Sequence, residues 1–135
     1  MLRFPCAVFS LVLLFVFIAT CAPAMPPASG GVNGAQGHAL ITSLGAKLLI
    51  LDVRTPEEFN QGHVPGAVLI RAQELAQRLG ELPTDSPVLL ICRTGRRARI
   101  AYDILVAARP RMLETGLWYL AATPVYKTDG TFVFP

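Results

Sequence analysis

The segment of the chain best suited to chemistry is residues 92–97, with the sequence Cys-Arg-Thr-Gly-Arg-Arg. It follows an aliphatic run and precedes a stretch with helical spacing, so main-chain N–H groups at the start of that helix should converge on the Cys92 sulfur. These N–H groups and the guanidinium groups favour the thiolate, which is the nucleophilic form of cysteine. The alternative, an inert cysteine that ends a core strand beside solvated arginines, explains neither the glycine nor the cations. We therefore predict that Cys92 is a reactive thiol.

The length of this loop bears on which anion it could hold. Cysteine-based phosphatases and arsenate reductases use a similar anion-binding loop, usually with five residues between the cysteine and the closing arginine. That position is Ala98 here, whereas Arg97 closes the loop after four intervening residues. A smaller loop suits a sulfur anion better than a tetrahedral phosphate, so the spacing argues against phosphatase activity.

Alternating aliphatic and amphipathic stretches predict the fold that positions the loop. Strands are predicted at residues 47–53, 67–70 and 88–91, the last of which delivers Cys92 at its carboxyl end. Helices are predicted at residues 38–44, 72–79 and 97–109, and at a capping box that begins with Thr55. This alternation indicates an α/β fold with a mostly parallel central sheet flanked by helices on both faces, in which ligands bind at the carboxyl ends of the strands.

The C-terminal region follows a different pattern. Residues 112–122 are apolar and contain Trp118, which is expected to pack in the core. Residues 125–134 predict a hairpin that turns near Asp129-Gly130.

Residues 1–24 have the pattern of a secretory signal peptide. Arg3 precedes an apolar stretch, and Ala22-Pro23-Ala24 fits the small-residue cleavage site. Two alternatives are a retained N-terminal membrane anchor, because residues 4–24 are uncharged and long enough to cross a bilayer, and lipidation at Cys21. Residues 25–37 are rich in Ala, Pro and Gly and predict a flexible linker, so the folded domain is predicted to span residues 38–135. We expect an exported, periplasmic protein that contacts the membrane only if its N-terminus is uncleaved or lipidated.

Composition limits the remaining classes of function. The 135 residues carry a formal net charge of +3, which is too small to indicate a nucleic-acid partner. Cys6 and Cys21 lie in the predicted signal peptide, so the mature domain keeps one thiol and no internal disulfide is expected. One cysteine and two distant histidines lack the spacing of metal ligands. The sequence therefore predicts neither a metal site nor a cofactor.

Three motifs, in this order and spacing, resemble a single-domain rhodanese, or sulfurtransferase. They are LDVRTPEEF at residues 51–59, GHVPGA at residues 62–67, and the Cys92 loop. The resemblance implies a thiosulfate sulfurtransferase in which Cys92 cycles between thiol and persulfide. The sulfur would come from a small sulfur-containing anion such as thiosulfate and pass to cyanide, a thiol or a protein acceptor.

The resemblance also suggests roles for the neighbouring residues. Loop N–H groups would hold the terminal sulfur anion, while arginines would grip the sulfonate of the donor. Arg97 could bind substrate or brace the loop, and both roles stay open. The predicted substrate-binding residues are Arg93, Thr94, Gly95, Arg96 and Arg97. The residues predicted to border the pocket or support it structurally are Asp52, Arg54 and His63.

The chain departs from the family pattern after the predicted 97–109 helix. Many rhodaneses continue with a Gly-Gly turn and a later tryptophan, whereas residues 113–118 here read Leu-Glu-Thr-Gly-Leu-Trp. This departure keeps a second function open, that of a non-enzymatic persulfide carrier or a module that binds small anions.

Overall fold

The computed structural model describes residues 27–135. The predicted signal peptide, together with the alternatives of anchoring and of lipidation at Cys21, lies outside the described residues. Between residues 27 and 135 the structure contains no helix both long and apolar enough to cross a bilayer.

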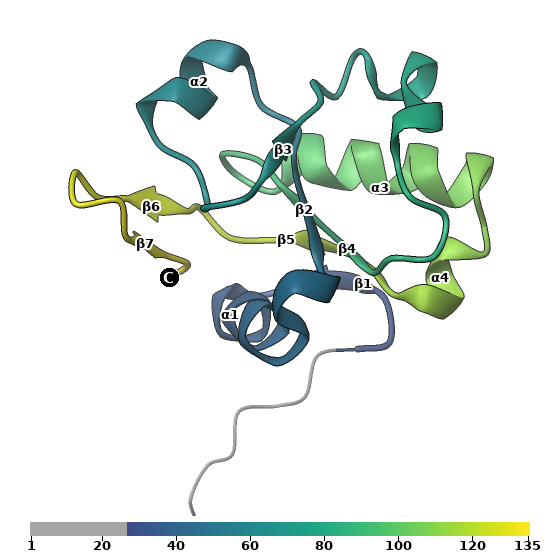
Figure 1. Cartoon of the computed structure of the whole chain (residues 1–135), viewed down its shortest axis with the longest axis horizontal. Coiled ribbons are helices and arrows are strands. Elements are labelled where there is room, and N and C mark those ends of the chain that lie inside the picture. The colour runs from purple at the N-terminus through teal and green to yellow at the C-terminus, as the bar shows by residue number, and fades with distance from the viewer. Residues whose placement is uncertain (1–26) are drawn as a thin grey trace, which may run out of the picture.

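A five-stranded sheet forms the centre of the domain (Figure 1). In spatial order its strands are β1 (Gly30–Val32), β5 (Leu117–Leu120), β4 (Val88–Ile91), β2 (Leu49–Asp52) and β3 (Val68–Leu69). Every neighbouring pair is parallel. All carboxyl ends therefore lie along one edge of the sheet, and Cys92 directly follows the central strand β4 at that edge.

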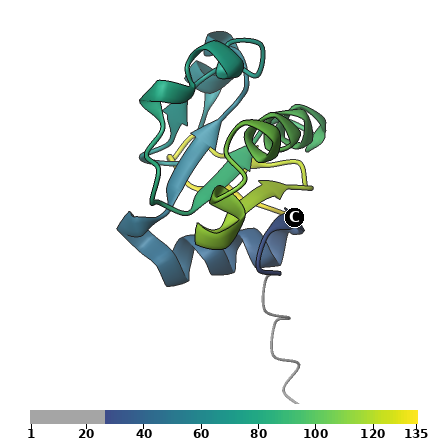
Figure 2. The same cartoon turned by 90° about the vertical axis from the view of Figure 1, so that its right-hand side faces the viewer.

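Helices cover both faces of this sheet, as the views in Figures 1 and 2 show. Helix α1 (Gly34–Leu44) lies on one face, and α3 (Arg96–Ala108) and α4 (Met112–Thr115) lie on the other. The short helix α2 (Pro56–Gln61) follows β2 at the carboxyl-end edge. The predicted α/β class, with a parallel sheet between helices, is confirmed.

The residues of β4 alternate between the two hydrophobic cores. Leu89 and Ile91 pack in the cluster that contains Leu40 of α1. Leu90 and Cys92 pack in the other cluster, with the buried face of α3. Because successive side chains of a strand point to opposite faces, this alternation places the Cys92 side chain on the α3 face of the sheet.

The prediction of a flexible linker over residues 25–37 is wrong from residue 30 onward. Residues 30–32 form β1, and Asn33 caps α1 through a capping box with Gln36. The glycines that suggested flexibility instead allow close packing, since a Cβ added at Gly34 would lie 2.3 Å from the Phe134 carbonyl oxygen. One added at Gly37 would lie 2.9 Å from a methyl carbon of Leu120. The described fold therefore begins before the predicted start at residue 38.

The predicted helix over residues 72–79 is instead a pair of 3-10 turns, Leu75–Gln77 and Leu79–Glu81. The Arg78 N–H is shared between the Glu74 and Leu75 carbonyls, so the backbone tightens where an α-helix would continue. Leu75 is fully buried. That side chain is buried without a longer helix. The four-residue spacing of Leu75 and Leu79 therefore predicted the wrong element.

The C-terminal region completes the sheet and then leaves it. The apolar stretch from residue 112 divides into α4 and β5, and Trp118 of β5 is buried, its Nε1 donating to the Pro27 carbonyl at 2.7 Å. The predicted hairpin is confirmed as β6 (Val125–Tyr126) paired antiparallel with β7 (Phe132–Val133). Figure 1 shows this hairpin at the side of the domain where α2 lies.

Candidate active site

Cys92 is held at the end of the central strand by neighbours on both sides. Strand β4 pairs with β2 and β5, and the Cys92 side chain is buried, with 1% of its surface exposed. Its Sγ accepts a hydrogen bond of 3.1 Å from the Gly95 N–H. Gly95 is the N-cap of α3, so the sulfur lies at the N-terminus of a 13-residue helix. Both the N–H group and the helix dipole stabilise negative charge on this sulfur.

The loop conformation requires glycine at position 95. Gly95 has a φ of +85°, in the left-handed region. A Cβ there would lie 3.0 Å from the Leu120 carbonyl oxygen and 3.1 Å from the Ala121 Cα. The loop thus packs against the chain leaving β5, and this close approach directs the Gly95 N–H at the sulfur.

Arg97 is tied to α2 by two short hydrogen bonds. Its Nη1 donates to Oε2 of Glu58 at 2.6 Å, and its Nη2 donates to Oε1 at 2.7 Å. The same carboxylate accepts the Thr55 N–H at 3.0 Å within the capping box of α2. The Arg97 guanidinium lowers the pKa of Glu58 to about 2, so the pair is ionic throughout the neutral range. This pairing favours a bracing role for Arg97.

Three other residues of the loop face solvent. Arg93, Thr94 and Arg96 are exposed, and within residues 27–135 the guanidinium groups of Arg93 and Arg96 form no hydrogen bond or ion pair. Arg99 differs, because it pairs with Asp103 and contacts Tyr119 on the surface of α3. Arg93 and Arg96 therefore present uncommitted positive charge beside Cys92.

Asp52 and Arg54 form a buried ion pair at the end of β2. Both Nε and Nη2 of Arg54 donate to the Asp52 carboxylate, with a shortest distance of 2.6 Å. Nη2 also donates to the Gly62 carbonyl at 2.7 Å. These contacts connect β2 to the turn after α2, so the pair supports the edge of the site.

His63 lies in that turn and is exposed. Its Nδ1 donates to the Phe59 carbonyl at 2.9 Å, and its ring stacks on that of Phe59 with centroids 3.7 Å apart. The histidine thereby fixes the end of α2. It also lines a cleft of about 300 Å³ between this turn and the hairpin, together with Tyr126 and Lys127.

Sequence reasoning missed two residues that the fold brings to this site. Glu58 is the second residue of the capping box that begins with Thr55, but its pairing with Arg97 spans 39 positions. Tyr126 of β6 lies with its ring 4.7 Å from the Arg54 guanidinium carbon. No local pattern signals either contact, because each joins segments that meet only in the folded sheet.

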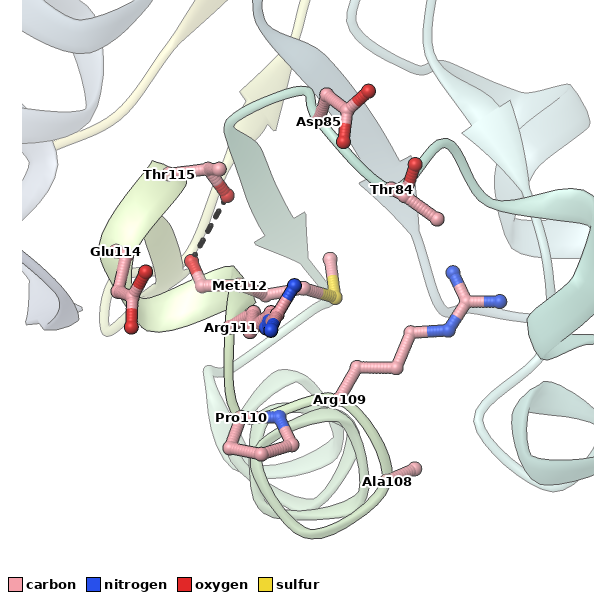
Figure 3. A pocket seen from close by; sticks show the side chains of 9 residues that line it. All are labelled: Thr84, Asp85, Ala108, Arg109, Pro110, Arg111, Met112, Glu114 and Thr115. Atoms are coloured by element: carbon pink, nitrogen blue, oxygen red, sulfur yellow. Dashed lines mark hydrogen bonds between the residues drawn. The ribbon is translucent and has the colours of Figure 1, made fainter.

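A separate cavity of about 630 Å³ has no residue of the Cys92 loop in its lining, and Figure 3 shows the side chains that surround it. It is bounded by Thr84 and Asp85 ahead of β4 and by the α3–α4 turn, which places it near the amino end of that strand. The Arg109 guanidinium donates to the carbonyls of Leu79 and Leu82, at 2.6 and 3.1 Å. Arg109 therefore joins α3 to the 3-10 turns and contributes no group to the Cys92 site.

Comparison with known proteins places this arrangement in a family. Residues 37–123 match the model of the rhodanese-like domain. A protein of Allochromatium vinosum named sulfurtransferase is 37% identical over 88 residues, which cover 62% of this chain and 82% of that protein. A thiosulfate sulfurtransferase GlpE of Shewanella oneidensis is 35% identical over 83 residues, covering 62% of this chain and 70% of that protein.

Solved structures of rhodanese-like proteins have a similar fold. The human single-domain sulfurtransferase TSTD1 superposes with a TM-score of 0.56 at 22% identity, covering 67% of this chain and 88% of that one, which supports the fold. Other matches cover less of the relative: the chain spans 38% of the HTH-type transcriptional regulator Rv0324 of Mycobacterium tuberculosis, at 38% identity, and 29% and 45% of two Bacillus subtilis proteins. Residues 37–123 match the rhodanese-like domain, and the central strand of the parallel sheet ends at the Cys92 loop. This chain belongs to the rhodanese-like family.

Proposed function

We propose that this protein is a sulfurtransferase that carries sulfane sulfur as a persulfide on Cys92. The observation that carries the proposal is the position of the Cys92 sulfur at the N-terminus of α3, where it accepts a hydrogen bond from the Gly95 N–H. Arg93 and Arg96 beside it are exposed and have no partner within residues 27–135. The relatives named sulfurtransferase and thiosulfate sulfurtransferase support the same chemistry.

The proposed reaction has two steps that balance without a cofactor. In the first, the Cys92 thiolate attacks the outer sulfur of thiosulfate, the S–S bond of the donor breaks, and sulfite leaves with the electron pair. In the second, a nucleophile such as cyanide or a thiolate attacks the terminal sulfur of the persulfide and restores the Cys92 thiolate. Each step is a displacement at sulfur in which one anion replaces another, so no proton needs to be removed once the thiolate has formed.

Each part of the loop has a role in this scheme. The Gly95 N–H and the start of α3 stabilise the anion before and after sulfur is added, as an oxyanion hole stabilises oxygen. Arg93 and Arg96 are placed to attract the doubly charged donor, while Arg97 holds the loop against α2.

Steady-state formation of thiocyanate from thiosulfate and cyanide tests the proposal. Cys92→Ser should lower the rate by more than about a hundredfold, because it removes the covalent nucleophile. In the uncleaved full-length chain, Cys21→Ser and Cys6→Ser are matched controls, since these cysteines lie outside the rhodanese-like region and should leave the rate unchanged. A Cys92→Ser protein that keeps more than about a tenth of the activity would contradict the proposal.

We also propose that residues 1–24 direct export, with the mature domain in the periplasm and a retained membrane anchor as the alternative. The charge of Arg3, the apolar stretch and the Ala-Pro-Ala site support this. Mass spectrometry of the protein recovered from fractionated cells tests it. Periplasmic protein lacking the first 24 residues is expected, whereas intact protein in the cytosol would contradict export.

A further inference from the structure

His38 of α1 contacts the C-terminal end of the hairpin, at a place that the proposed mechanism does not use. The Phe134 N–H donates a hydrogen bond of 3.1 Å to Nε2 of His38, across 96 positions of the chain. The His38 ring also stacks on Phe132, with centroids 5.4 Å apart, and lies against Phe134 at 4.7 Å. Figures 1 and 2 both show the C-terminal end of the chain beside α1. One imidazole therefore fastens the end of the hairpin to this helix.

The direction of this hydrogen bond defines the protonation state of the imidazole. A main-chain N–H can only donate, so Nε2 of His38 accepts and carries no proton, and the single proton of the neutral ring is on Nδ1. A second proton would turn Nε2 into a donor that faces another donor. The hydrogen bond between Phe134 and His38 therefore exists only while the imidazole is neutral.

The surroundings of His38 supply no anionic partner for a protonated ring. Helix α1 has no other ionisable side chain. The ionisable groups on the strands and the hairpin that pack against this helix are Asp52, Tyr119, Tyr126, Lys127, Asp129 and the main-chain carboxyl oxygen of Pro135, which packs on Gly34. Asp52 is engaged by Arg54, and the Asp129 carboxylate accepts from Thr131. Within residues 27–135 no ion pair includes the half-buried His38, so protonation would break a hydrogen bond without forming a salt bridge.

We propose that His38 is a pH-sensitive latch, which holds the end of the hairpin on α1 while it is neutral and releases it when it is protonated. Histidine is the side chain whose ordinary change of charge falls between pH 5 and 8. Release would expose Phe134, which is buried in the folded domain. It would also loosen the hairpin residue Tyr126, whose ring lies 4.7 Å from the Arg54 guanidinium carbon. The latch thus links acid pH to a loosening of the structure at the end of β2.

Hydrogen exchange of the Phe134 amide tests the latch. The protection factor, which corrects for the direct effect of pH on exchange, is compared at about pH 7.5 and about pH 5. We expect it to fall about tenfold in acid, a change that corresponds to the loss of one hydrogen bond. The Val53 amide donates to the Ile91 carbonyl at 2.9 Å in the central sheet. It should stay protected, which would show that the domain remains folded.

Two variants of His38 separate its proton from its packing. His38→Gln keeps an acceptor that takes up no proton in this range, and His38→Phe keeps an aromatic ring without an acceptor. Protection of the Phe134 amide should be independent of pH in both variants, and it should be lower in His38→Phe. His63→Gln is the matched control, since the chain has two histidines and His63 contacts the Phe59 carbonyl instead. This control should keep the pH dependence of the wild type.

Three results would overturn the inference. The first is unchanged protection of the wild-type Phe134 amide over this range of pH, and the second is an equal loss at Phe134 and Val53, which would mean global unfolding. The third is a pH dependence that persists in both His38 variants or disappears in His63→Gln. None of these results alters the proposed sulfur transfer, which rests on Cys92 and its loop.

Discussion

Arg97 and Glu58 are joined by two hydrogen bonds of 2.6 and 2.7 Å, although 39 positions separate them in the chain. The pair links the loop that holds Cys92 to the first turn of α2, whose capping box uses the same carboxylate. One glutamate therefore both starts a helix and braces the candidate active site. The parallel, two-bond geometry is one that arginine provides and lysine does not.

Weakening the Arg97–Glu58 pair should reduce the rate of sulfur transfer, although Cys92 itself is unchanged. Arg97→Lys keeps the charge but cannot make both hydrogen bonds, so the loop should shift and kcat/KM should fall roughly 10- to 100-fold. Glu58→Gln should have a similar effect because it removes the other partner.

A double-mutant cycle separates a shared role from two independent ones. Since the residues are in contact, the double variant should be little worse than either single variant, which steady-state kinetics can show. Fully additive losses would mean that Arg97 acts on the substrate rather than through Glu58.

Acid should remove the contribution of this pair to stability. The pKa of Glu58 falls from its ordinary 4.5 to about 2 in the folded protein, so the stabilisation is complete above about pH 4.5 and is lost as the pH drops towards 2. The difference in free energy of unfolding between the wild type and Glu58→Gln should therefore be constant near neutrality and shrink below pH 4.5. Urea denaturation across this range measures it. Glu114→Gln is the control, since Glu114 is exposed and unpaired within residues 27–135. A pH-independent difference in the free energy of unfolding for Glu58→Gln would contradict the ionic pairing of Glu58 with Arg97.

The two exposed arginines of the loop should act on donor affinity. Arg93→Ala and Arg96→Ala should each raise the KM for thiosulfate about tenfold, because a dianion loses a charge-assisted contact. Stability should change by less than about 0.5 kcal/mol, since neither guanidinium has a partner among the described residues. Arg99→Ala removes the same charge nearby from an arginine that is paired with Asp103, and it should leave the KM unchanged. Equal increases in the KM for thiosulfate at all three positions would indicate that the arginines act through their overall positive charge. They would argue against specific contacts between thiosulfate and Arg93 or Arg96.

Gly95→Ala should disrupt the loop through its backbone. Residue 95 has a φ of +85°, and the new Cβ would lie 3.0 Å from the Leu120 carbonyl oxygen. We expect a loss of about 1–3 kcal/mol in the free energy of unfolding and a strong loss of activity, because the N–H that contacts Cys92 moves away. Gly80→Ala is the control, since nothing lies within 4 Å of its added Cβ. Normal activity in Gly95→Ala would show that this N–H is dispensable.

Much of the architecture was predictable because it depends on local pattern. The aliphatic run at residues 88–91 is β4 as predicted, and the capping box at Thr55 starts α2. Residues 30–37 could not be identified, because their small residues resemble a linker. They are ordered by contacts with β5 and with the chain terminus near Phe134.

The site was predictable to the same degree. Cys92 and its loop stand together in the sequence, so their proximity needs no tertiary information. The separate roles of Arg97 and Arg93 could not be assigned, because the difference lies in a carboxylate supplied by α2. Tyr126 was not identified for a similar reason, since its contact with Arg54 exists only when the hairpin folds back over the carboxyl ends of the strands.

The most direct test of sulfur transfer through Cys92 is the mass of the intact protein after a brief reaction with thiosulfate and removal of the donor. The account predicts a gain of one sulfur atom that maps to Cys92, is accompanied by one equivalent of sulfite, and disappears on addition of cyanide. The Cys92→Ser protein should gain nothing. Sulfite release without any added mass on Cys92, or the same adduct in Cys92→Ser, would contradict it.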